Sequence, residues 1–483
     1  MEVFGYKSTL NAVYDMFAFG GAYRNRTDED CILLFKNALE ENEELALKCL
    51  FYLRDIRGGQ GERRFFRVCF RWLAKEYPDI AARNLENISE YGRWDDLYSV
   101  VGTKVEKAMF AEIINQLDLD MEALNMGDKF GVSLLAKWLK SENASSKETK
   151  KLAELTRKAL GLSHKKYRKI LSALRTRINI VETLMSEGKW EQIEYAKLPS
   201  KAGLIYRNAF AKRDAERYAE FINSKETKVN AGTLYPYDIV DKVTNKLNWR
   251  GEINIDDTER EVLNKYWANQ KDYLDGKSCK IMCIVDTSGS MDSKYSASVK
   301  PIDVAISLSM YCGERIGEPF KNYFISFSSR PQLIKIEGID FVDKVARIYC
   351  QNLCEDTNLK AVFDMLLDMY QCGKVKAEDL PTQLIVISDM EINRGSYWDD
   401  EETRATEMRK IRNQWKVSGA VMPKLIYWNV NARSNLILDD ADNDDVTFVS
   451  GCSPVIFQSI LTGKSGIQLM LEKLNSERYQ QVK

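Results

Sequence analysis

The sequence contains a single histidine, His164, among its 483 residues. Any Ser-His or Cys-His nucleophile, and any histidine-based metal site, would have to use that one side chain. It stands in GLSHKKYRK, among basic residues of an expected helix, where an ordinary surface position explains it. The sequence therefore nearly excludes histidine-dependent catalysis, and we expect a protein that is not an enzyme.

Cysteine pairs and long apolar runs are also missing. The ten cysteines include no CxxC pair, and no histidine or second cysteine pair joins Cys350 and Cys354 in a zinc set. They are typical of small hydrophobic residues in a reducing compartment. No apolar run approaches the roughly 18 residues of a membrane span, and MEVFGYKSTLNAVYDMF lacks the pattern of a signal peptide. We therefore expect a cytoplasmic protein with no membrane partner.

Positive charge is not in excess, because 70 Lys and Arg stand against 71 Asp and Glu and the net charge is −1. A uniformly basic coat for nucleic acid is thereby excluded. The charge is unevenly placed, however. Residues 147–213 hold seventeen basic and six acidic residues, whereas residues 1–146 hold nineteen and twenty-four. The neutral total conceals a basic segment next to an acidic one.

The two halves of the chain differ in hydrophobic pattern. Residues 1–230 are almost continuously helical in pattern, which predicts HEAT-like helical hairpin repeats without a fixed sequence period. Residues 276–483 alternate apolar strands such as IMCIVD with helices, which predicts a doubly wound parallel sheet. Residues 231–275 are rich in aromatics and poor in Gly and Ser, so we expect a structured connector packed on both domains. The expected fold class is α followed by α/β.

Oxygen-bearing side chains follow the expected strands of the second half. Asp286, Ser288 and Ser290 come after the first strand, Thr357 begins a helix, and Asp389 ends the strand QLIVIS. Ligands of an open α/β sheet bind beyond the carboxyl ends of its strands. Two carboxylates and three hydroxyls form a hard oxygen set suited to Mg²⁺ or Mn²⁺. Because most of these groups are neutral and no histidine serves as a base, we expect binding rather than hydrolysis. A serine-rich turn over a sheet is the plainer alternative.

The helix expected after Ser163 combines an apolar stripe with a basic face. A face of this kind can follow a phosphate backbone, since arginine forks suit phosphate oxygens. A solvated lysine-rich helix explains the same residues. The basic face comprises Lys165, Lys166, Arg168, Lys169, Arg175 and Arg177.

A second group of arginines flanks the turn RGGQG, next to Phe65, Phe66 and Trp72. Arginine with aromatics suits RNA loops and single strands, although a core position explains the aromatics more simply. The arginines of this group are Arg54, Arg57, Arg63, Arg64, Arg67 and Arg71.

The order Asp-x-Ser-x-Ser, Thr, Asp resembles the metal-ion-dependent adhesion site (MIDAS) of von Willebrand factor A domains. A helical-hairpin domain followed by such a domain resembles the Ro autoantigen family with its TROVE module, and still more a sister family with the same layout. The resemblance covers nearly the whole chain, through FYLRDIRGGQGER, YGRWDDL, YPYDIV, VDTSGSM and the stretch that ends in LPSKAGLIYRNAF. One departure is local: Glu355 and Asp356 precede Thr357 where many relatives carry glycines, and Glu391 adds acidity nearby.

The resemblance implies a cytoplasmic ribonucleoprotein component without catalytic activity. In Ro proteins the helical repeats close into a ring and bind small structured or misfolded RNA, and the A domain carries Mg²⁺ or Mn²⁺ with a position open to an acidic group. The alternative is a protein-interaction or assembly module that captures a partner's carboxylate at the metal. A metal-dependent hydrolase is the third hypothesis.

Overall fold

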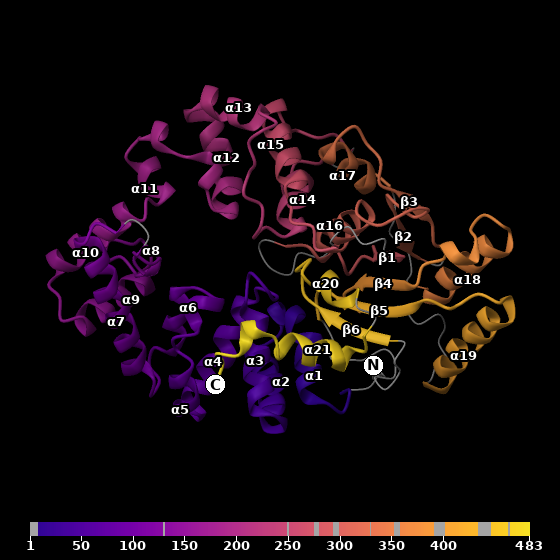
Figure 1. Ribbon diagram of the computed structural model, residues 1–483, viewed down its shortest axis with the longest axis horizontal. Coiled ribbons are helices and arrows are strands. Elements are labelled where there is room, and N and C mark those ends of the chain that lie inside the picture. The colour runs from indigo at the N-terminus through magenta and orange to yellow at the C-terminus, as the bar shows by residue number, and fades with distance from the viewer. Residues whose placement is uncertain are drawn as a thin grey trace.

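The computed structural model describes residues 8–128, 131–248, 251–274, 280–292, 299–328, 330–351, 358–390, 401–432, 446–461 and 464–483, with residues 401–408 described by their backbone alone. The described residues between 12 and 268 form a series of helices, and a sheet with its own helices follows. The architecture is thus mixed, with an α part followed by an α/β part. Figure 1 shows both parts and the positions of their elements.

Local sequence signals account for many of the helix boundaries in the first part. Thr27 and Asp30 form a capping box, in which each side chain accepts the other's backbone N–H at the start of α2. The turn RGGQG ends α3 and precedes α4. The helices are α1 (Ala12–Phe19), α2 (Asp28–Glu41), α3 (Glu43–Arg54), α4 (Arg63–Glu76), α5 (Pro78–Arg83), α6 (Ile88–Tyr91), α7 (Glu106–Asn125), α8 (Leu135–Trp138), α9 (Lys147–Ala159), α10 (His164–Arg177), α11 (Val181–Ser186), α12 (Ser200–Arg213), α13 (Ala215–Asn223), α14 (Pro236–Thr244) and α15 (Asp257–Ala268), with the 3-10 helices η1 (Gly20–Asn25), η2 (Trp94–Val100), η3 (Trp190–Gln192) and η4 (Tyr195–Lys197).

The second part is built on short apolar strands that are buried almost throughout. Its strands are β1 (Ile281–Asp286), β2 (Tyr323–Phe327), β3 (Leu333–Lys335), β4 (Gln383–Ser388), β5 (Lys424–Asn429) and β6 (Val446–Ser450). Its helices are α16 (Pro301–Gly313), α17 (Phe341–Tyr349), α18 (Leu359–Gln371), α19 (Glu401–Ser418), α20 (Ile456–Ile460) and α21 (Gly466–Leu474), with the 3-10 helices η5 (Ala377–Asp379) and η6 (Glu477–Tyr479).

The described strands form one sheet in the order β3-β2-β1-β4-β5-β6. All neighbouring pairs are parallel except β2 and β3, which are antiparallel. The sequence pattern predicts a parallel sheet and does not single out β3. The reason for the difference is the connection of only a few residues between β2 and β3, which is too short for the crossover that parallel strands need. The strand order reverses between β1 and β4, and the carboxyl ends of strands at such a point are where open α/β sheets bind ligands.

Helices cover both faces of the sheet (Figure 1). On one face α16 packs on β1 and β2, and its Tyr311 ring stacks on Phe457 of α20 with centroids 5.7 Å apart. On the other face, α18 packs on α19 through an edge contact between Phe363 and Trp415. This two-sided cover explains why the strands are continuous apolar runs.

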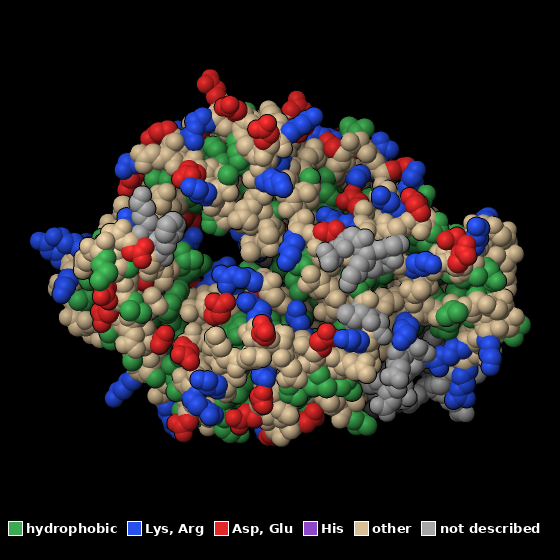
Figure 2. All heavy atoms as spheres, in the orientation of Figure 1, with side chains coloured by type: hydrophobic (Ala, Val, Ile, Leu, Met, Phe, Trp, Pro, Cys, Tyr) green, Lys and Arg blue, Asp and Glu red, His purple; other side chains and the backbone are tan. Residues whose placement is uncertain are grey.

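The helices of the first part form an arc, and both ends of that arc contact the sheet domain (Figure 1). Near its start α1 packs on β6, and at its end α14 packs on α16 and α17. Figure 2 shows an opening between the arc and the elements that join its two ends. The arc and the sheet domain therefore surround a space that is open on the viewed face.

Contacts between residues far apart in the sequence attach the start of the arc to the sheet domain. The Tyr14 hydroxyl donates to the Phe448 carbonyl of β6 at 3.4 Å and accepts from its N–H at 3.1 Å. Gly21 lies so close to Ser450 that an added Cβ would stand 2.7 Å from the Ser450 carbonyl oxygen. Only glycine allows η1 to approach β6 this closely.

The C-terminal residues bind the arc at a second place. Arg478 forms an ion pair with Asp55, which is completely buried, and the Tyr479 hydroxyl donates to the same carboxylate at 3.1 Å. The Tyr479 ring stacks on Tyr91 of α6 at 5.5 Å. The Tyr235 hydroxyl, just before α14, donates to the Gln60 carbonyl at 3.0 Å and so links the other end of the arc to the RGGQG turn.

No helix in the described ranges has both the length and the apolar character needed to cross a membrane. The cysteines that the structure describes are free thiols, and six of the eight are buried. The six buried cysteines agree with the prediction that cysteine serves as a small hydrophobic residue, whereas Cys350 and Cys372 are exposed.

Replacing Asp55 with alanine should lower the free energy of unfolding by about 3 kcal/mol, because Arg478 and Tyr479 lose a buried charged acceptor. Chemical denaturation of Asp55→Ala and wild type measures this difference. Asp118→Ala, an exposed aspartate on α7, serves as the control and should change stability little. Equal stability of the two variants would contradict the attachment described here.

Candidate functional site

The carboxyl ends of β1 and β4 bring together polar residues that lie about a hundred positions apart. The strands are parallel neighbours, and Val285 is paired with Ile387. This register sets Asp286 beside Ser388, with Asp389 next along the chain. The predicted residues of these two strands therefore meet at one edge of the sheet.

Hydrogen bonds fix the orientation of the Asp286 carboxylate. The Ser388 hydroxyl donates to its Oδ2 at 2.5 Å, and the Ser288 N–H donates to its Oδ1 at 2.9 Å. The hydroxyls of Ser288 and Ser290 lie 3.0 Å apart. Ser388 was not among the predicted residues, although its place at the end of a strand next to Asp389 is a usable signal.

Both carboxylates at this edge are removed from water. Asp286 and Asp389 have exposed fractions of 0%. Burial raises the pKa of Asp286 above its ordinary value, and the hydrogen bonds from Ser388 and Ser288 oppose that rise. Met390 follows with a φ of 63°, a left-handed conformation that costs free energy for a residue with a side chain. Buried acids next to a strained turn are features of binding sites.

The hydroxyl-bearing loop opens the edge to the surface, since Ser288 and Ser290 are half-buried and Gly289 is exposed. Thr357 lies outside the described residues, as do its neighbours Glu355 and Asp356, and so does Glu391.

The donor chemistry fits a hard divalent cation. Two carboxylates and two hydroxyls of the described residues are oxygen ligands of the kind that Mg²⁺ and Mn²⁺ accept. Within the part of the chain that the structure describes, no group of three or more His, Cys, Asp or Glu side chains could hold a metal. Neutral hydroxyls would therefore have to supply part of the ligand set, as the sequence pattern predicts.

The basic face of α10 lies on the outer side of the arc, where Figure 2 shows Lys and Arg side chains projecting at the left edge. Tyr167, Leu171 and Leu174 are buried and attach the helix to its neighbours. Four of the six predicted cations are exposed and stand close together in the first half of the helix: Lys165, Lys166, Arg168 and Lys169.

Arg175 and Arg177 have a different role. Arg175 donates to the Ala136 carbonyl at 2.8 Å, to the Leu139 carbonyl at 2.9 Å and to the Ser141 hydroxyl at 2.9 Å. Arg177 donates to backbone carbonyls at the end of α7. These two side chains hold α10 to the segment around α8 and do not belong to the exposed group. Helical periodicity alone could not separate them, because acceptors on other helices decide their role.

Most of the arginines that flank RGGQG are bound to acceptors within the protein. Phe65 and Phe66 are completely buried, so the aromatics of this region belong to the core. The acceptors are Asp96 for Arg54 and Arg67, the Glu90 carbonyl for Arg57, Asp28 for Arg64, and the Ser99 and Val101 carbonyls for Arg71.

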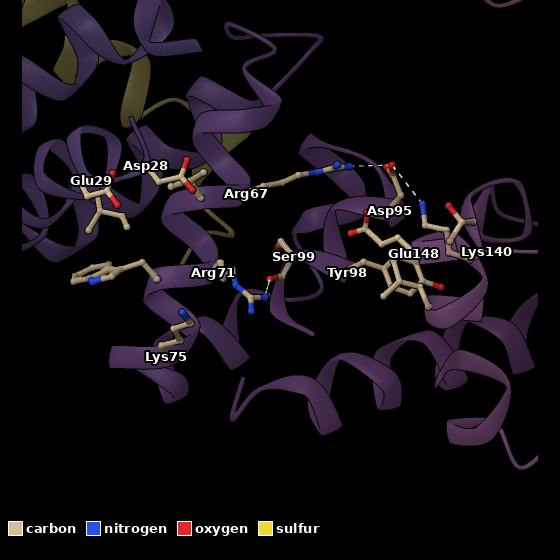
Figure 3. A pocket seen from close by; sticks show the side chains of 15 residues that line it. Asp28, Glu29, Arg67, Arg71, Lys75, Asp95, Tyr98, Ser99, Lys140 and Glu148 are labelled. Atoms are coloured by element: carbon tan, nitrogen blue, oxygen red, sulfur yellow. Dashed lines mark hydrogen bonds and ion pairs between the residues drawn. The ribbon is translucent and has the colours of Figure 1, made fainter. Parts of the chain in front are cut away.

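A pocket of about 640 Å³ lies between α4, η2 and the start of α9 (Figure 3). Three of its four cations have partners: Arg67 and Lys140 both point to Asp95, at 2.9 and 4.0 Å, and Arg71 donates to the Ser99 carbonyl, whereas Lys75 is exposed. Acidic side chains, among them Glu148, line the same space. Because its charges are of both signs, the pocket offers no preference for a polyanion.

His164 lies at the exposed start of α10, and its Nδ1 is 2.7 Å from Glu142 Oε1. The described surroundings thus agree with the surface position expected for it.

Arg175→Ala should lower the free energy of unfolding by about 2–3 kcal/mol, because two carbonyls and a hydroxyl lose a charged donor. Lys169→Ala, an exposed cation of the same helix, should be nearly neutral. Thermal unfolding of the two variants beside wild type measures the difference. If Arg175→Ala leaves the free energy of unfolding unchanged, Arg175 belongs with the exposed basic group.

Comparison with known proteins gives the relatives of this chain. The family model described as Domain of unknown function (DUF2828) matches residues 2–116 and 132–277, and the one described as Domain of unknown function (DUF7788) matches residues 280–482. An uncharacterized protein of Acanthamoeba polyphaga mimivirus is 26% identical over 499 residues, which cover 95% of this chain and 83% of that protein. Neither family description names Ro proteins or von Willebrand factor A domains, so that resemblance stays a prediction. The first match spans more than half of the sequence, and the chain belongs to the DUF2828 family.

Proposed function

We propose that this protein binds RNA without catalysing a reaction on it, through the exposed basic face of α10. The observation that carries the proposal is the group Lys165, Lys166, Arg168 and Lys169, which are all exposed. Within the described part of the chain none of the four has an ion-pair partner. A phosphate backbone supplies the missing negative charge at a spacing that a helix face can follow.

The position of these cations on the helix supports a role in binding rather than in stability. They stand in the first half of α10, whose first turn contains no acidic residue. Cations near a helix amino end oppose the helix dipole, and like charges three or four positions apart repel one another. Glutamine, which carries no charge, would stabilise the helix more than these cations do at the same positions. A solvated helix therefore does not explain this pattern as well as a polyanionic partner does.

The resemblance to Ro proteins supports the same function. It suggests that the arc corresponds to helical repeats and the sheet domain to a von Willebrand factor A domain. Asp286, Ser288, Ser290 and Asp389 are the residues that would hold Mg²⁺ or Mn²⁺, with Thr357 as the further expected ligand. A bound divalent cation supplies positive charge that attracts an acidic group.

The most direct test is to purify the protein from its natural host and to sequence the nucleic acid that accompanies it. A discrete small RNA, signalled first by a high ratio of absorbance at 260 nm to that at 280 nm, would support the proposal and identify the ligand. Protein free of nucleic acid that also fails to bind RNA oligonucleotides at low salt would refute it.

A triple variant that combines Lys165→Ala, Arg168→Ala and Lys169→Ala should weaken RNA binding by about tenfold or more. It should also reduce the magnitude of the slope of log K against log [salt] by about 2, because each lost phosphate contact removes roughly 0.7–0.9 from that slope. A salt titration of binding measures both. The matched control changes Lys36, Lys104 and Lys107, three exposed cations elsewhere in the helical part, to alanine. If both triple variants lose affinity equally, net charge and not the α10 face governs binding.

Mg²⁺ should raise the unfolding temperature of the wild-type protein, because a ligand of the folded state at 100 times its Kd stabilises it by about 2.7 kcal/mol. Asp286→Asn should abolish this effect. Without metal, Asp286→Asn should be at least as stable as wild type, because a neutral amide replaces a buried carboxylate. Asp118→Asn is the control and should keep the response. An Mg²⁺ response in Asp286→Asn equal to that of wild type would refute the site.

A second candidate function is a protein-interaction or assembly module that captures a partner's carboxylate at the strand-end site. One observation favours it: Gly289 is exposed between two half-buried serines, so a partner can reach the edge of the sheet. Mg²⁺-dependent recovery of a defined protein partner, lost in Asp286→Asn, would favour this candidate over RNA binding.

A further inference from the structure

Two arginine side chains and two neighbouring aspartates meet where α3, α4 and η2 come together. Asp96 is completely buried and accepts hydrogen bonds from Arg54 Nε at 2.8 Å, from Arg67 Nε at 2.5 Å and from the Arg93 N–H at 3.0 Å. Arg67 also pairs with Asp95 at 2.9 Å. Arg54 and Arg67 thus bind Asp96, and Arg67 also binds Asp95, whose Oδ1 has no hydrogen-bond partner among the described residues.

Two more guanidinium groups lie beside this network. Arg63, the first residue of α4, and Arg93 both feel the charges of Arg54, Asp95 and Asp96. In the described part of the chain neither forms an ion pair. The Arg93 guanidinium lies over the Trp138 ring, 4.5 Å from its centroid, and this contact holds it in place.

The local charge is therefore unbalanced. Arg54, Arg63, Arg67 and Arg93 carry four positive charges against the two negative charges of Asp95 and Asp96. A surplus of two positive charges remains, and the Lys140 ammonium at 4.0 Å from Asp95 increases it.

The surplus disfavours the charged form of the unpaired arginines. Burial, and after it the neighbouring charge of Arg63, lower the pKa of Arg93 to about 10. Burial also lowers the pKa of Arg63, with the charge of Arg54 next in importance. Both groups nevertheless stay protonated at neutral pH. Two cations are held together here at the expense of stability.

We propose that Arg63 and Arg93 form a site for a phosphate group. Two guanidinium groups present parallel N–H donors, which match the oxygens of a phosphate. The surplus of two positive charges matches a phosphate dianion or pyrophosphate better than a carboxylate with its single charge. Figure 2 shows Lys and Arg side chains gathered at the edge of the opening, on the side of α3, α4 and α6.

The contacts and charges given above support the phosphate site without reference to RNA. The assignment of the bound phosphate to an RNA strand rests on the proposed function. On that assignment, the α10 face holds RNA on the outer side of the arc and the Arg63–Arg93 site binds a phosphate of a strand near the opening. The two surfaces differ in location and can be changed separately.

Calorimetric titration of the full-length protein with inorganic pyrophosphate at low ionic strength tests the site. Arg63→Gln and Arg93→Gln should each weaken binding by about tenfold, and the double variant should abolish it. Arg83→Gln, an exposed arginine on α5, is the matched control and should bind as wild type does. Without ligand, the unfolding temperature of the double variant should equal or exceed that of wild type, because it lacks the repulsion between cations.

The outcomes separate this inference from the proposed function. Pyrophosphate binding that the double variant loses and Arg83→Gln keeps supports the site even if no RNA binds. Loss of single-stranded RNA affinity in the double variant as well assigns the phosphate to RNA. The site is overturned if the wild type does not bind pyrophosphate or if the double variant binds it unchanged. It is also overturned if the double variant is markedly less stable than wild type, because both arginines would then be structural.

Discussion

The attachment of both ends of the helical arc to one sheet domain is the constraint on which the rest of the structure depends. α1 and η1 reach β6 through Tyr14 and Gly21, and α14 packs on α16 at the other end. Between these ends the arc consists of short helices that contact few elements beyond their immediate neighbours. The two attachments fix where the arc begins and ends on the sheet domain. The same domain presents the strand-end acids, so the position of that site relative to the arc is fixed as well.

Local signals in the sequence predict much of this fold. The capping residues Thr27 and Ser163, the glycine-rich turn and the buried strand runs each act within a few residues, and the structure has helices and strands there. The meeting of Asp286 with Asp389 also follows from sequence, because strand ends of a doubly wound sheet share an edge. The order of the strands is enough to predict that these two residues lie at the same edge, and the exact register is not needed.

Partners from distant segments could not be predicted in the same way. Arg175 and Lys169 have the same helical environment in the sequence, yet one binds carbonyls around α8 and the other faces water. Among the arginines near RGGQG, the tertiary positions of Asp28, Asp95 and Asp96 decide which cations are neutralised. The surroundings of Arg93 could not be predicted either, because Arg63 and Trp138 lie thirty and forty-five positions away. Charge counts identify basic regions, but they do not show which charges remain available.

The hydrogen bonds between Tyr14 and Phe448 span 434 positions of sequence, and this separation has a consequence for synthesis. Because a ribosome adds residues in order, α1 emerges long before the strand that covers it exists. During that interval Tyr14 and the surface of α1 that packs on β6 lack their final neighbours. The helical part therefore cannot reach its final packing co-translationally. A chain truncated before β6 should expose an N-terminal surface that chaperones or other nascent chains can bind.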